Sequence, residues 1–72
     1  MGAVTELQAE RERAGFTIAE LSRRSGVPVE VIEAAEAGSR PNLYAQGRLA
    51  SALGEVMAEL FPRPWAGVSN GG

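Results

Sequence analysis

The chain has 72 residues, 44% hydrophobic and 22% charged, a composition that suits one small globular domain and excludes a disordered chain. It has no cysteine or histidine, and its charges are all arginine or glutamate, which excludes disulfide scaffolds, the commonest metal sites and the usual catalytic bases; we expect neither an enzyme nor a cofactor. The net charge of −2 gives no overall attraction to nucleic acid or membrane, and without a membrane-spanning run or a signal peptide we expect a cytoplasmic protein.

Glycine and proline divide the chain into five stretches of helical composition, and only residues 27–32 have a strand-like composition, with a spacing that also suits a helix. The first two predicted helices are Thr5–Ala14 and Ile18–Ser25. Thr5 and Thr17 stand at their starts, each with Gln or Glu three residues later, which is the form of a capping box. A glycine directly after each stretch predicts where the helix ends.

The other three predicted helices are Pro28–Ala37, Leu43–Leu53 and Val56–Phe61. Asn42 is suited to cap the fourth, and Gly47 inside it costs roughly 0.5–1 kcal/mol relative to alanine. A close approach between helices is one explanation for that glycine, and sequence drift is another. The expected core residues are the apolar side chains on the inner side of each stretch: Leu7, Phe16, Leu21, Val27, Ile32, Leu43, Leu49, Leu53, Leu60 and Phe61.

The most informative segment runs from residue 17 to residue 38, where two short predicted helices are joined by a tight turn. Ser22 is small enough for two helices to cross closely, and Gly26 allows a sharp turn. Val27 is placed to fill the gap between the helices, and Ile32 to fix the second helix to the core. These features predict a helix-turn-helix.

Together with its flanks, this segment resembles the phage-repressor-like (Xre-type) helix-turn-helix family. Residues 7–17, Leu-Gln-Ala-Glu-Arg-Glu-Arg-Ala-Gly-Phe-Thr, resemble the family's first helix and the entry to its second. Residues 40–54, Arg-Pro-Asn-Leu-Tyr-Ala-Gln-Gly-Arg-Leu-Ala-Ser-Ala-Leu-Gly, followed by Glu-Leu-Phe, resemble its fourth and fifth helices. The resemblance implies an all-α, five-helix, lambda-repressor-like helix-turn-helix domain whose third helix enters the DNA major groove. We expect this domain to span residues 1–61, followed by a partly flexible tail, 62–72.

The resemblance also implies roles for individual residues. Arg11 and Glu36 match positions that often form an ion pair between the first and third helices, which is a structural role. The DNA-binding positions that it implies lie in the second and third helices and the loop that follows: Thr17, Ile18, Arg23, Pro28, Val29, Glu30, Glu33 and Arg40.

Two departures from the family pattern affect that surface. Ile18 stands where the family commonly has glutamine, and isoleucine cannot donate to a phosphate. The third helix carries Glu30, Glu33 and Glu36 and no positive charge. Glutamate can accept from cytosine N4 and valine can meet a thymine methyl, so base reading is chemically possible. Phosphate contacts would come from arginines that equally suit solvated positions: Arg23, Arg24, Arg40 and Arg48.

Two functional hypotheses follow. The first is a sequence-specific transcriptional regulator of the phage or mobile-element kind, a repressor that binds double-stranded DNA as a homodimer on a two-fold operator. The second is a protein-interaction module with the same fold, whose acidic third helix binds another regulatory protein. Self-association is expected through the apolar end of the chain: Met57, Leu60, Phe61 and Trp65. Trp65 equally suits a position folded back on its own domain.

Overall fold

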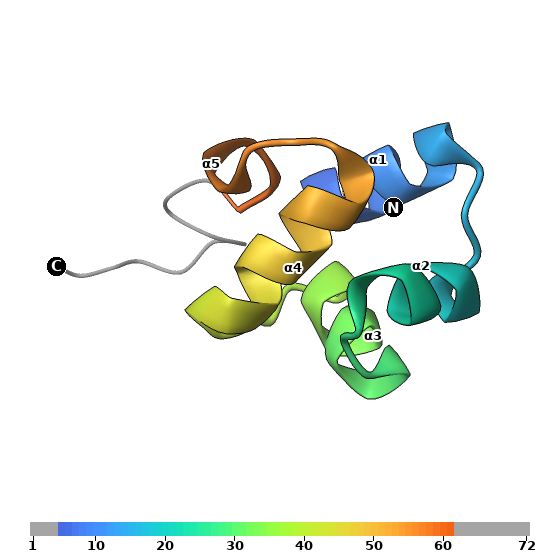
Figure 1. Ribbon diagram of the computed structural model, residues 1–72. Coiled ribbons are helices and arrows are strands. Elements are labelled where there is room, and N and C mark those ends of the chain that lie inside the picture. Colours follow the sequence, from blue (N-terminus) through green and yellow to red (C-terminus); the bar gives the residue numbers. More distant parts are fainter. Residues whose placement is uncertain (1–4, 62–72) are drawn as a thin grey trace, which may run out of the picture.

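The computed structural model describes residues 5–61, so the predicted tail at 62–72, with Trp65, lies outside the described residues. The elements are α1 (Glu6–Ala14), α2 (Ile18–Ser25), α3 (Val29–Glu36), α4 (Leu43–Leu53) and α5 (Met57–Leu60) (Figure 1). Residues 5–61 contain no strand, and the stretch 27–32 forms a turn and the start of α3. The predicted all-α, five-helix architecture is confirmed. None of the five helices is long and apolar enough to span a membrane.

The predicted capping boxes are half formed. The hydroxyl of Thr5 accepts a hydrogen bond from the Gln8 amide at 3.2 Å, and that of Thr17 accepts from the Glu20 amide at 3.0 Å. The side chains that would complete each box turn along their own helix instead. Gln8 donates to Glu12 at 3.0 Å, and Glu20 pairs with an arginine one turn later. Each helix start therefore has one of its free amides satisfied by a side chain.

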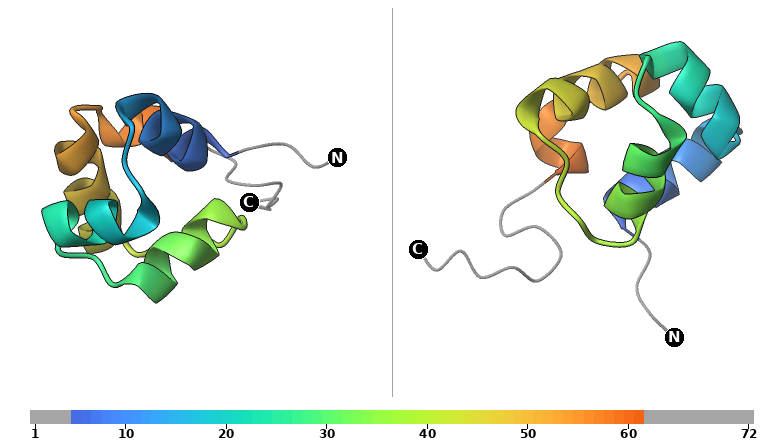
Figure 2. Two further views of the ribbon diagram at one scale, coloured as in Figure 1. Left: turned by 90° about the vertical axis from the view of Figure 1, so that its right-hand side faces the viewer. Right: turned by 90° about the horizontal axis from the view of Figure 1, so that it is seen from below.

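The five helices pack so that α4 contacts α1, α2 and α5, while α3 packs against α1 and α2 (Figures 1 and 2). The connection from α3 leads the chain to the start of α4. Because α3 has neighbours on its inner side only, its outer side is left open to solvent. This arrangement sets the position of the candidate site.

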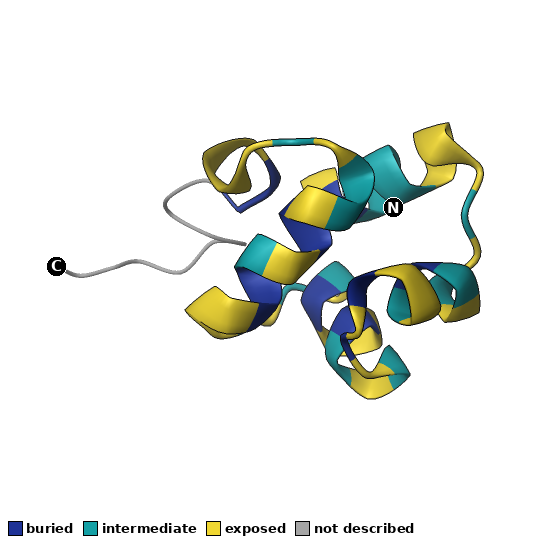
Figure 3. Cartoon of the chain, in the orientation of Figure 1, coloured by how far each residue is buried: buried dark blue, intermediate teal, exposed yellow. Residues whose placement is uncertain are grey.

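The core consists of apolar side chains from the inner faces of all five helices and the α2–α3 turn: Leu7, Leu21, Val27, Ile32, Ala35, Ala45, Leu49, Ala50, Leu60 and Phe61. Figure 3 shows these buried positions along the sides of the helices that face one another. Phe16 and Leu53 are only partly buried and pack at the edge of this core.

Leu43 was expected in the core and is 70% exposed, so that prediction is wrong. Leu43 is the first residue of α4, directly after the Asn42 cap, and the inner side of the helix begins two residues later. Part of that inner side is polar, since Gln46 is only 3% exposed. Its side-chain amide donates to the carbonyl of Pro41 at 2.7 Å, which satisfies the buried group and ties α4 to the preceding loop.

Candidate nucleic-acid interface

The turn between α2 and α3 is fixed by three hydrogen bonds. Gly26 has a φ of 78°, and its amide donates to the Ser22 carbonyl at 2.8 Å, which ends α2. The Ser22 hydroxyl donates to the Val27 carbonyl at 2.6 Å, and the Val27 amide donates to the Ser25 hydroxyl at 3.1 Å. Ser22 was expected only to be small, and it also closes the turn. These bonds hold α2 and α3 as one rigid unit.

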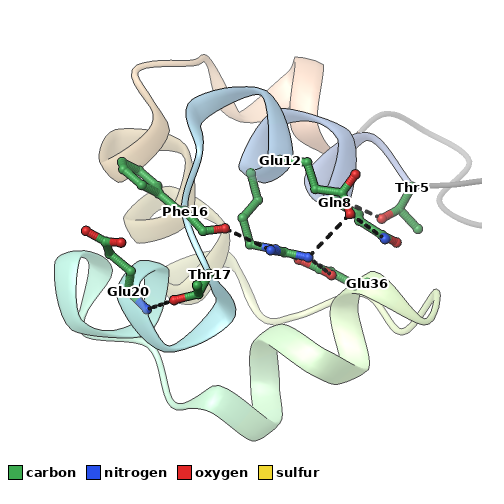
Figure 4. Close-up of polar contacts among 8 residues, drawn as sticks. Thr5, Gln8, Glu12, Phe16, Thr17, Glu20 and Glu36 are labelled. Carbon is green, nitrogen blue, oxygen red and sulfur yellow. Dashed lines mark hydrogen bonds and ion pairs between the residues drawn. The ribbon is translucent and has the colours of Figure 1, made fainter.

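A buried ion pair holds α3 against α1. The Arg11 guanidinium donates to both carboxylate oxygens of Glu36, at 2.5 and 3.0 Å, and to the Phe16 carbonyl at 2.8 Å (Figure 4). The two charged side chains are only 12% and 9% exposed. The hydrogen bond to Glu36 raises the pKa of Arg11 above its usual range. Arg11 and Glu36 thus form the ion pair that the family resemblance implies, and it fixes the angle at which α3 is presented.

The outer side of α3 carries four exposed residues, Glu30, Glu33, Ala34 and Ala37, which we call the outer stripe of α3. Their spacing of three, four and seven residues places them on one face of the helix. Pro28, just before the helix, is also exposed. The outer stripe of α3 is therefore accessible along its whole length, acidic near its start and methyl-bearing near its end.

The positions predicted at the start of α2 and α3 are less available. Thr17 is exposed, but its hydroxyl is engaged in capping α2. Ile18 is partly buried and packs against the core, so it presents less surface to DNA than an exposed residue would. An apolar residue in the first turn of a short helix gains more from burial than from facing water. Val29 is half-buried beside the exposed Pro28.

The two arginines at the end of α2 differ in their surroundings. Arg23 is exposed and has no hydrogen bond or ion pair with any of residues 5–61. Arg24 lies over the ring of Phe16, 4.6 Å from its centroid, and pairs with Glu20 at 3.3 Å. Arg23 is thus the more available of the two for a phosphate.

The other two candidate phosphate contacts are tied to backbone carbonyls. Arg40 donates to the Phe61 carbonyl at 3.4 Å, linking the α3–α4 loop to the end of α5. Arg48 donates through Nε to the Ser25 carbonyl at 2.9 Å and lies 5.7 Å from the centroid of the Tyr44 ring. The link from Arg48 to the end of α2 was missed in the sequence, because no local pattern marks a contact between residues 23 positions apart.

The predicted self-association residues are divided between core and surface. Leu60 and Phe61 are 0% and 2% exposed, so they belong to the core and present no surface to a partner. Met57 is 37% exposed, and the neighbouring Val56 is 60% exposed. Trp65 lies outside the described residues.

A group of carboxylates away from α3 was also missed in the sequence. Glu10 and then Glu59 raise the pKa of Glu55 above its ordinary value of 4.5, through hydrogen bonding to its carboxyl group and through charge repulsion. Glu10 also pairs with Arg13 at 3.0 Å. Among residues 5–61, no cluster of three or more acidic side chains is arranged to hold a metal ion.

Comparison with known proteins gives one match. The family model described as "Helix-turn-helix" matches residues 7–60, well over half of the chain. No curated protein and no solved structure matches the chain significantly. The matched segment begins in α1, ends in α5 and contains the whole α2–turn–α3 unit.

Proposed function

Because the chain belongs to the Xre-type helix-turn-helix family of DNA-binding transcription regulators, we propose that it is a repressor that binds a two-fold DNA operator sequence-specifically as a homodimer. Occupying an operator is sufficient to block transcription, so repression is the simplest role for one such domain. The observation that carries the proposal is the outer stripe of α3, which no other described element covers, on a helix held rigidly by the α2–α3 turn and the Arg11–Glu36 pair. In this role α3 enters the major groove and α2 lies across the DNA backbone.

The chemistry of the outer stripe of α3 limits which bases it reads. Glu30 and Glu33 are exposed acceptors that suit the N4 amino group of cytosine. Ala34 and Ala37 present methyl groups that suit the thymine methyl. The stripe has no arginine, so it cannot make the bidentate guanine contact that is commonest in such sites. We therefore expect a half-site rich in pyrimidines on the strand that α3 contacts.

The affinity of this interface is expected to be low at physiological salt. Binding energy in DNA complexes comes largely from neutralising phosphates, with about 0.9 counterions released per phosphate contact. On the α2–α3 side, Arg23 is fully available, and Arg40 lies in the following loop. Two glutamates beside the phosphates oppose them. Because each copy offers few cations to the phosphates, binding of two copies to one duplex is favoured.

The homodimer is proposed to form through the apolar surface at the start of α5. Val56 and Met57 are exposed there, and the Met57 methyl lies near Gly47 of α4. A two-fold operator has half-sites about 34 Å apart, one turn of DNA, and we propose that a two-fold axis through this surface matches that spacing. Each copy then adds its own phosphate contacts.

Selection from random duplexes at low salt tests DNA reading. We expect one enriched sequence with two-fold symmetry. Glu30→Gln or Glu33→Gln should change the preferred base at one position by about 1–3 kcal/mol, because each removes an acceptor from the groove. Glu59→Gln, an exposed glutamate on α5, is the matched control. Arg40→Ala should weaken binding to every sequence and flatten the salt dependence, by about one phosphate contact. Unchanged base preference in both glutamine variants argues against α3 as the reading helix.

Sedimentation tests the homodimer. The wild-type chain should associate at micromolar concentration, and Val56→Arg should remain monomeric because two cations would meet at the axis. Leu43→Arg places the same charge on another exposed apolar residue, at the start of α4, and should still associate. A wild type that is monomeric at high micromolar concentration, with and without DNA, contradicts this part of the proposal.

The second candidate function is a module that binds another regulatory protein through the outer stripe of α3. The observation in its favour is that Glu30 and Glu33 give this exposed surface two carboxylates and no side-chain donor. A basic protein surface complements it without a phosphate backbone to repel it. This candidate is favoured if the duplex selection enriches nothing while Glu30→Gln and Glu33→Gln weaken a partner's binding.

A further inference from the structure

A half-open hollow of about 320 Å³ lies between the end of α2 and the middle of α4, on residues outside the outer stripe of α3. It is lined by two arginines, two serines and two small residues, and by no acidic residue: Arg24, Ser25, Gly47, Arg48, Ser51 and Ala52. In a chain with an excess of glutamate, this local concentration of positive charge is unusual. The hollow is therefore a candidate site for an anion.

The two guanidinium groups retain unused donors. The Nε of Arg48 donates a hydrogen bond to the Ser25 carbonyl, and its terminal nitrogens form no hydrogen bond with residues 5–61. One terminal nitrogen lies 3.0 Å from the position a Cβ would take on Gly26, so the guanidinium lies directly on the turn. Arg24 makes only one long bond, at 3.3 Å, to Glu20. A guanidinium has five N–H donors, so both side chains can still bind an anion.

Ser25 provides an independent reason to expect an acceptor in the hollow. It is 2% exposed, and its hydroxyl oxygen accepts from the Val27 amide. Its hydroxyl proton has no acceptor among residues 5–61. Buried donors are nearly always satisfied, so a group that only accepts hydrogen bonds would complete this site.

Gly47 of α4 forms part of the lining of the hollow. A Cβ on Gly47 would meet only the Met57 methyl, at 4.0 Å, which is ordinary contact. Helix packing therefore does not require glycine at this position. Residue 47 therefore lines the hollow without adding a side chain to it.

We propose that this hollow binds a phosphate group. Phosphate offers acceptors only, and guanidinium groups bind it in a planar, often bidentate geometry. The negative end of the α2 dipole would oppose an anion, but Arg48 already covers the last carbonyl of that helix. The phosphate has two possible sources, the DNA backbone or a free phosphorylated small molecule. The first source rests on the proposed function, and the second does not.

Titration of the full ¹⁵N-labelled chain with inorganic phosphate tests the site directly. We expect saturable shifts of the amides of Ser25, Arg48 and Ser51 that chloride at equal ionic strength does not produce. Ser51 is exposed and its side chain has no partner among residues 5–61, so Ser51→Glu adds a carboxylate to the hollow without removing a contact. It should weaken phosphate binding at least tenfold, and Ser51→Gln should not. Equal shifts with chloride, or equal binding in the two variants, overturns the proposal.

Duplexes of unrelated sequence identify the source of the phosphate. If it is the DNA backbone, Ser51→Glu should weaken binding to every duplex several-fold and reduce the salt dependence by about one phosphate contact. Ala14→Glu, on exposed α1, carries the same charge change away from the hollow and should do neither. If the two variants bind duplex equally while Ser51→Glu has lost inorganic phosphate, the source is a free phosphorylated molecule. Because the phosphate titration needs no DNA, its outcome is independent of whether the chain binds an operator.

Discussion

Arg11 and Arg48 each donate a hydrogen bond to a backbone carbonyl at a turn, but they differ in their burial and in their other partners. Arg11 donates to the carbonyl of Phe16, and Arg48 donates to the carbonyl of Ser25. In each case a helix ends at that turn in a glycine with a left-handed backbone. The turns at the ends of α1 and α2 thus each accept one hydrogen bond from an arginine, from within α1 in the first case and from α4 in the second.

The difference between them lies in their remaining donors. Arg11 is almost buried, and each of its guanidinium nitrogens bonds to Glu36 or to the turn. Arg48 is exposed, has Tyr44 as its ring neighbour and has no carboxylate partner among residues 5–61. A nearly buried guanidinium whose three nitrogens are all bonded within the domain can only stabilise the fold. An exposed one whose terminal nitrogens are not bonded within residues 5–61 can stabilise the fold and bind a ligand as well.

The largest expected effect on stability comes from disrupting the Arg11–Glu36 ion pair. Glu36→Gln keeps the shape of the side chain and leaves the Arg11 charge, at 12% exposure, with only the exposed Glu12 carboxylate 3.8 Å away, which should cost about 3–5 kcal/mol. A domain of this size rarely has more than about 3–5 kcal/mol of stability in total. We therefore expect largely unfolded protein at 25 °C, measured by circular dichroism at 222 nm and by urea denaturation.

A double variant separates the ion pair from the space it fills. Arg11→Met with Glu36→Leu removes both charges and keeps apolar volume between α1 and α3, and should recover most of the lost stability. If Glu36→Gln lowers the free energy of unfolding by less than about 1 kcal/mol, the bonds between Arg11 and Glu36 contribute little to stability. The contrast drawn between Arg11 and Arg48 is then wrong.

The ion pair shows which tertiary contacts a sequence can predict. Arg11 and Glu36 are 25 residues apart, and only the resemblance to a family joined them. The contact of Arg48 with the Ser25 carbonyl has no such signal, because a backbone acceptor is the same at every residue. The helices themselves were predicted within one or two residues, since their caps and glycines are local features.

The next largest effect tests whether the Arg48 side chain stabilises the turn between α2 and α3. Gly15 and Gly26 have nearly the same φ, 80° and 78°, so alanine at either should cost roughly 1–2 kcal/mol in backbone strain. A Cβ on Gly15 meets nothing within 4 Å, whereas one on Gly26 meets Arg48 at 3.0 Å. Gly26→Ala should therefore cost about 1 kcal/mol more than Gly15→Ala, the value of one hydrogen bond. Equal urea midpoints for the two variants would mean that Arg48 contributes nothing to the turn.

The candidate site was predicted less completely than the fold, for a physical reason. The spacing of Glu30 and Glu33 correctly placed them on the open side of α3, because helical periodicity separates inside from outside. Leu60 and Phe61 are predicted both for the core and for self-association, and they lie in the core, while Ile18, predicted for the DNA surface, packs partly buried against it. An apolar side chain suits a core and an interface equally well, so only packing decides between them.

A smaller effect, of opposite sign, is expected in the hollow beside Arg48. Gly47→Ala should stabilise the domain by about 0.5–1 kcal/mol, because glycine is a poor helix former and the added methyl meets only Met57 at 4.0 Å. Because Gly47 also lines the hollow, we expect the added methyl to reduce the hollow's volume and inorganic phosphate to bind more weakly, although the domain is more stable. Ala52→Gly, also on the lining, is the reverse change and should destabilise α4. A destabilised Gly47→Ala would mean that helix packing needs this glycine.

The smallest effect concerns Glu55, whose pKa is raised by the neighbouring carboxylates of Glu10 and Glu59. The Glu36 carboxylate, in contrast, is paired with an arginine. Because the pKa of Glu55 is higher in the folded chain than in the unfolded one, the folded state binds its proton first, and the repulsion is relieved as the pH falls through that raised pKa. At pH 7 the group is charged and destabilising, so Glu55→Gln should raise the melting temperature slightly. Glu6→Gln, an exposed glutamate at the start of α1, is the matched control and should not raise it, since it loses a favourable charge near a helix start. The advantage of Glu55→Gln should shrink as the pH is lowered toward the ordinary glutamate value of 4.5, and should also shrink in high salt at pH 7. An advantage that grows on acidification would have the wrong sign, and would show that the carboxylates at this end of the domain do not repel one another.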